Sequence, residues 1–106
     1  MTKYLLVITT VPDAEAGQII AEKIIEERLA ACVNLSAAIQ SLYWWKEKIT
    51  QDQEYVLSIK TTNDAYARLE KKILQIHPYE VPEIIALPIS GGNKAYLDWV
   101  ERETQA

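Results

Sequence analysis

The chain has 106 residues, of which 49% are hydrophobic and 25% charged, a composition typical of one globular domain and not of a disordered or fibrous protein. Its net charge of -4 and its pI near 5.0 argue against a nucleic-acid partner, which requires clustered cationic side chains. The single cysteine, Cys32, excludes an intramolecular disulfide, and no signal peptide or membrane anchor is visible, so we expect one cytoplasmic domain over residues 1–106 with no membrane contact.

The chain begins with a predicted strand followed by a helix. Residues 4–10 are almost continuously apolar and rich in β-formers, which is typical of a central strand buried on both faces. A helix is expected over residues 14–30, because apolar residues recur there at four-residue spacing after the capping residue Asp13. Gly17 lies inside this helix and predicts a close approach of the helix to the sheet.

A long hairpin is predicted next. Residues 32–45 alternate between apolar and polar side chains, as in one long strand. After a turn at residues 46–48, a second strand runs to about Thr61. The tip of this hairpin carries three consecutive aromatic residues, at positions 43–45.

The second half of the chain predicts a helix, a strand and a last helix. Thr62 or Asn63 caps the first of these helices, which ends at His77 before a proline. Residues 84–89 form an edge strand between prolines, and Asn93 caps the last helix.

The resulting order, β-α-β-β-α-β-α, predicts an α+β fold of the ferredoxin-like βαββαβ type with an added C-terminal helix. Such a sheet has helices on one face only, so its other face and the aromatic hairpin need a cover. Exposed aromatic strands of this length are aggregation hazards unless they pair. We therefore expect a homo-oligomer held together by sheet contacts between subunits.

The sequence offers two kinds of candidate site, the first for a metal ion. His77, with Glu80 and Glu83 nearby, offers an imidazole and carboxylates to a divalent cation. Cys32 offers a soft ligand suited to Cu(I). The structural interpretation is favoured for both: His77 ends a helix without other ligands at zinc-like spacing, and Cys32 packs as a small hydrophobe.

The second candidate is a ligand cleft between subunits. It would be lined by Trp45 and Tyr79, with Lys60 and Glu80 as its polar groups. A hydrophobic subunit interface explains the aromatic residues equally well. No Ser-His-Asp or Cys-His arrangement is recognisable, so we do not expect an enzyme.

Five segments, in order and at compatible spacing, resemble the CutA family and together span nearly the whole chain. They are Leu29-Ala30-Ala31-Cys32-Val33-Asn34, Ser41-Leu42-Tyr43-Trp44-Trp45-Lys46, Ile59-Lys60-Thr61-Thr62, His77-Pro78-Tyr79-Glu80-Val81-Pro82-Glu83-Ile84-Ile85 and Tyr96-Leu97-Asp98-Trp99. The resemblance implies a homotrimer whose long hairpins pair between subunits.

The resemblance to the CutA family also implies a role in tolerance of divalent cations, chiefly copper, and a trimer similar in shape to the PII signalling proteins. One hypothesis is thus a trimer that binds Cu(II) or a similar cation, with no cofactor needed for folding; the alternative is a PII-like module for a small ligand or a protein of unknown identity. The chain departs from the family at Glu47, where Gly is usual, which predicts a different turn or strain of about 1 kcal/mol.

Overall fold

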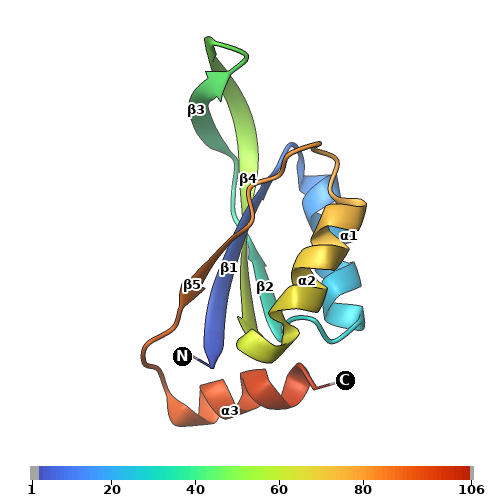
Figure 1. Cartoon of the computed structure of the whole chain (residues 1–106), viewed down its shortest axis with the longest axis vertical. Coiled ribbons are helices and arrows are strands. Elements are labelled where there is room, and N and C mark those ends of the chain that lie inside the picture. Colours follow the sequence, from blue (N-terminus) through green and yellow to red (C-terminus); the bar gives the residue numbers. More distant parts are fainter. Residues whose placement is uncertain (1–2, 106) are drawn as a thin grey trace.

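The computed structural model describes residues 3–105 and contains one antiparallel sheet and three helices (Figure 1). Helices α1 and α2 cover one face of the sheet, and α3 crosses its end near the N-terminus. The strand order is β2-β4-β1-β5, and β3 pairs with the N-terminal half of β4. This confirms the predicted α+β class and the central place of the first strand. The elements are β1 (Tyr4–Val11), α1 (Ala14–Glu26), β2 (Cys32–Leu35), β3 (Ile39–Trp45), β4 (Lys48–Thr62), α2 (Asn63–Ile76), β5 (Ile85–Pro88) and α3 (Lys94–Glu103).

The core lies between the sheet and the helices α1 and α2. Alternate side chains of β1 and β4 point into it and meet the apolar stripes of both helices, as the period of two along a strand and of 3.6 along a helix requires. Each of these residues is buried: Val7, Val11, Ile20, Ile24, Leu57, Ile59, Leu69 and Ile73. The opposite face of β1 is half-buried in the single chain, so burial on both faces is only partly seen.

The end of α1 differs from the prediction, since the helix stops at Glu26 and not at residue 30. Arg28 adopts a left-handed conformation, with φ of 61°. Its N–H donates to the Ile25 carbonyl at 3.1 Å, and the Leu29 N–H donates to the Ile24 carbonyl at 2.9 Å. These two bonds form a Schellman motif with arginine in place of the usual glycine, which is why the sequence carries no stop signal.

The predicted strand over residues 32–45 is in fact two strands, β2 and β3. Leu35 faces Leu57 and Ile39 faces Glu54, so three residues of one strand oppose two of the other. This is a β-bulge, held by Ser36, whose N–H donates to the Val56 carbonyl at 2.9 Å and whose Oγ accepts from the Val56 N–H at 2.8 Å. Both strands still pair with β4, and the extended hairpin projects from the sheet (Figure 1).

The hairpin closes in a two-residue turn, because Trp45 faces Lys48 across it. Lys46 and Glu47 both have positive φ, of 50° and 65°. This conformation matches the right-handed twist of the strands but disfavours residues with a Cβ. The chain therefore accepts strain at Glu47, one of the two outcomes expected from its departure from the family pattern.

Replacing Glu47 by Gly is expected to raise the free energy of unfolding by about 0.5 kcal/mol. Relief of about 1 kcal/mol of strain is offset in part by the greater freedom of glycine in the unfolded chain. Urea denaturation measures the change. Glu47→Ala is the matched control, because alanine keeps the Cβ, and an equal gain in both variants would contradict the role of strain.

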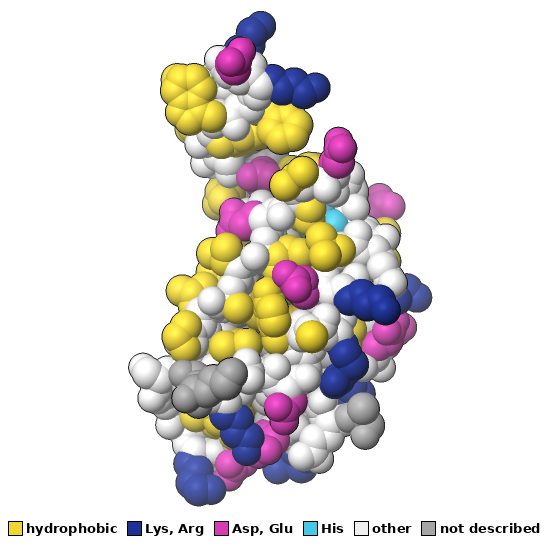
Figure 2. Space-filling model, viewed as in Figure 1, with side chains coloured by type: hydrophobic (Ala, Val, Ile, Leu, Met, Phe, Trp, Pro, Cys, Tyr) yellow, Lys and Arg dark blue, Asp and Glu magenta, His cyan; other side chains and the backbone are white. Residues whose placement is uncertain are grey.

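The face of the sheet away from the helices is largely apolar and exposed (Figure 2). β5 forms one edge of the sheet, as predicted from its prolines, and adds exposed apolar side chains to this face. The exposed apolar residues of the hairpin and of β5 are Ile39, Leu42, Tyr43, Trp44, Trp45, Ile49, Ile85 and Leu87. Many large apolar side chains exposed on neighbouring strands indicate an interaction site. No helix within residues 3–105 has the length and apolarity needed to cross a membrane.

Candidate functional site

His77 caps the C-terminal end of α2 and joins that helix to β1. Its Nε2 lies 2.8 Å from the Thr10 carbonyl oxygen, and its Nδ1 accepts from the Tyr79 N–H at 3.0 Å. An acceptor at Nδ1 and a donor at Nε2 define a neutral imidazole. Burial agrees with this state, since it lowers the pKa of His77 despite the Thr10 bond and the charge of Glu54. Both ring nitrogens are therefore occupied by protein groups.

Tyr79 extends the contact from His77 to β4. The two rings lie 5.0 Å apart, and the Tyr79 hydroxyl donates to Glu54 Oε2 at 2.7 Å. Glu54 is only 7% exposed, an unusual degree of burial for a carboxylate. Burial and the bond to Glu54 both raise the pKa of Tyr79, so its hydroxyl remains protonated and donates over the physiological range. Glu54 was not among the candidate site residues predicted from the sequence.

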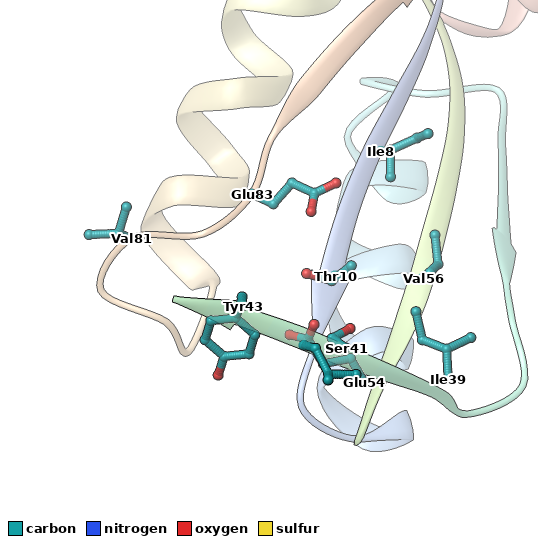
Figure 3. Close-up of a pocket in the computed structure, with 10 residues that line it drawn as sticks. Ile8, Thr10, Ile39, Ser41, Tyr43, Glu54, Val56, Val81 and Glu83 are labelled. Carbon is teal, nitrogen blue, oxygen red and sulfur yellow. The ribbon is translucent and has the colours of Figure 1, made fainter. Parts of the chain in front are cut away.

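A groove of about 490 Å³ opens beside Glu54 on the apolar face of the sheet (Figure 3). We call it the Glu54 groove. Its polar lining comes from four elements or connections: Thr10 on β1, Ser41 on β3, Glu54 on β4, and Glu83 before β5. In Figure 3 the Glu83 carboxylate points toward β1. The two carboxylates are the strongest ligands that the groove offers to a cation. The remaining lining is mainly apolar and consists of Ile8, Ile39, Leu42, Tyr43, Val56 and Val81.

A second pocket, of about 260 Å³, lies between the aromatic residues of β3 and the connection from α2 to β5. It brings together Trp45, Tyr79 and Glu80, three of the four residues predicted for a ligand cleft. The fourth, Lys60, is placed elsewhere, opposite Cys32 in the pairing of β2 with β4, where its ammonium group binds the Asn34 side chain.

The four predicted metal ligands do not converge in the single chain. Within residues 3–105 no group of three or more His, Cys, Asp and Glu side chains is arranged to hold a metal ion. Cys32 lies on β2 with its Sγ 4.0 Å from Asn34, whereas Glu83 lines the Glu54 groove and Glu80 the second pocket. A metal site therefore stays a prediction that needs donors from more than one copy.

Residues 5–103 match the family described as CutA1 divalent ion tolerance protein. The chain belongs to this family. The divalent-cation tolerance protein CutA of Thermus thermophilus is 46% identical over 99 residues, which cover 93% of this chain and 96% of that protein. Rice protein CutA 1, described as chloroplastic, is 46% identical over 101 residues, 95% of this chain but 57% of the rice protein. The chain thus spans little more than half the length of such longer CutA relatives.

Solved CutA1 structures have the same architecture. The structure from Shewanella sp. SIB1 superposes with a TM-score of 0.96 at 40% identity and covers 99% of this chain and 98% of that one. The protein from Archaeoglobus fulgidus, described as periplasmic, has a TM-score of 0.93 at 33% identity and covers 96% of this chain and 99% of that one. CutA relatives are thus described for different compartments, and a cytoplasmic location for this chain stays a prediction.

Proposed function

We propose that this CutA-family protein is a homotrimer of ferredoxin-like protomers that binds Cu(II) or a similar divalent cation where copies meet. The observation that carries the proposal is the position of the Glu54 groove. It opens on the exposed apolar face of the sheet, next to the hairpin, and this is the surface that a second copy would cover.

The ligand set supports this location for a cation. Glu54 and Glu83 supply carboxylates, and Thr10 and Ser41 supply further oxygen atoms. One chain alone provides no group of three side-chain ligands within its described residues, so a donor from another copy completes the site. His77 acts at a distance in this arrangement: through Tyr79 it holds Glu54 in place and does not ligate the metal.

The test is a calorimetric titration with Cu(II) combined with light scattering. The wild-type protein should have three times the mass of the 12.1 kDa chain and bind copper saturably. Glu83→Gln should weaken copper binding at least about tenfold, since even partners outside the ligand set contribute that much at metal sites. Glu80→Gln is the matched control, because Glu80 lies in the other pocket.

Two outcomes would contradict the proposal separately. A monomeric mass removes the assembly, and an unchanged copper affinity in Glu83→Gln removes the groove as the site. Neither measurement depends on a reaction or on a protein partner.

A second candidate function is a PII-like sensing module that holds a small ligand or a protein segment. The second pocket favours it, because an aromatic pair, Trp45 and Tyr79, lies there beside the charged Glu80. This function needs no metal. A trimer that shows no saturable copper binding in the same titration would favour the second candidate over the first.

A further inference from the structure

The exposed side of α2 carries a row of donors that the proposed cation site does not use. We call Arg68, Lys71, Lys72 and Gln75 the α2 basic stripe. Their spacing of i, i+3, i+4 and i+7 places them on one face of the helix, over a length of roughly 10 Å. They line a groove of about 380 Å³, whose other wall is formed by Glu27 and the buried Leu29 after α1.

The stripe holds cations that have no carboxylate partner. Among residues 3–105, Lys72 pairs with Glu27 at 2.9 Å, but neither Arg68 nor Lys71 belongs to any of the five ion pairs. Arg68 donates only to the Asp64 backbone carbonyl of its own helix, at 3.4 Å. In a chain with a net charge of -4, two neighbouring cations without a carboxylate partner are a local departure from the overall charge.

Helix stability accounts in part for Arg68, which follows Asp64 by four residues, but it does not account for Lys71. Like charges three or four residues apart destabilise a helix by about 0.2–0.5 kcal/mol per pair, and Arg68 has this relation to both Lys71 and Lys72. The positions three and four residues from Lys71 carry no carboxylate. The last turn of α2 contains no basic residue, so the stripe is also not placed to offset the helix dipole.

We propose that the α2 basic stripe binds an acidic segment of a partner protein. The donors lie in a row along one helix and do not converge on a point, which suits an extended chain with several carboxylates better than one small anion. Figure 2 shows several Lys and Arg side chains on the side of the molecule where α1 and α2 lie in Figure 1, and others at the tip of the hairpin and near α3. A duplex nucleic acid fits less well, because the protein as a whole is acidic.

The experiment uses the whole protein and a labelled hexapeptide of alternating Asp and Glu, followed by fluorescence anisotropy at low salt. We expect saturable binding that a matched peptide of Asn and Gln does not show. Lys71→Glu should weaken binding at least about fivefold, because it both removes an attraction and adds a repulsion, and added salt should weaken wild-type binding. Amide shifts in NMR spectra should change mainly at residues 27–29 and 68–75.

The control is Lys48→Glu, which makes the same change of charge on the hairpin, away from α2. Equal weakening in both variants would show that the peptide responds only to net charge and would overturn the proposal. The proposal would also be overturned by NMR amide shifts that change mainly outside the groove, or by the absence of binding at millimolar peptide concentration. If Lys71→Glu instead lowers the mass seen by light scattering, the stripe contacts another copy of this chain and the proposal also fails.

Discussion

His77→Ala is expected to lower the free energy of unfolding by about 3 kcal/mol. The substitution leaves two backbone groups without partners, the Thr10 carbonyl and the Tyr79 N–H, in a region where the His77 side chain is buried. Each buried unsatisfied group costs about 1–3 kcal/mol. Urea denaturation at one fixed protein concentration measures the loss, since the stability of an oligomer depends on concentration.

The pH dependence of stability gives an independent check on the role of His77. Burial lowers its pKa in the folded protein, so below the ordinary value near 6.5 the unfolded chain binds the proton more readily. The stabilising contribution of neutral His77 is therefore fully present above about pH 6.5 and is lost as the pH falls toward the lowered folded pKa. The difference in stability between wild-type and His77→Ala protein should shrink over this window.

Copper titration of the same variant separates a structural His77 from a metal ligand. We expect folded His77→Ala to bind copper, with an affinity reduced only through the looser hold on Tyr79 and Glu54. Tyr79→Phe is the matched control, because it removes the bond to Glu54 and keeps the ring and the backbone contact to His77. Wild-type stability together with complete loss of copper binding in His77→Ala would identify His77 as a ligand instead.

The helix caps were predictable from the sequence because they depend on local geometry. Asp13, Thr62 and Asn93 each accept a hydrogen bond from a backbone N–H three residues ahead, as their side chains predict. Alternation along β4 is likewise local: Leu57 and Ile59, two residues apart, are both buried. These features repeat with the period of their own element and need no knowledge of the rest of the chain.

Other features depend on contacts between distant segments and were missed. Arg28 ends α1 without a glycine, and its side chain binds Glu103 at 2.7 Å, 75 residues away. Glu54 lies on the predicted second strand, but its side chain is bound by Tyr79, 25 residues later. The spacing of residues within one element cannot predict contacts between distant segments. The Glu54 groove could therefore not be predicted from the sequence.

Gly17→Val is expected to lower the free energy of unfolding by about 3 kcal/mol. A Cβ at this position would lie 3.2 Å from Leu35 and from Val11 and 3.3 Å from Leu57, all side chains of the packed layer under α1. Valine adds two further methyl groups where one carbon is already tight, and such overpacking costs about 1–3 kcal/mol or more. Urea denaturation, with circular dichroism to confirm the fold, measures the loss.

Two controls separate packing from helix propensity. Gly17→Ala should change stability by less than about 1 kcal/mol, because the tight contacts of one methyl group are offset by the better helix propensity of alanine. Gln18→Val places the same β-branched side chain on the exposed face of α1, where its only recorded bond is to Glu22, and should also cost less than about 1 kcal/mol. Equal losses at positions 17 and 18 would show that helix propensity, and not the approach of α1 to the sheet, requires glycine at position 17.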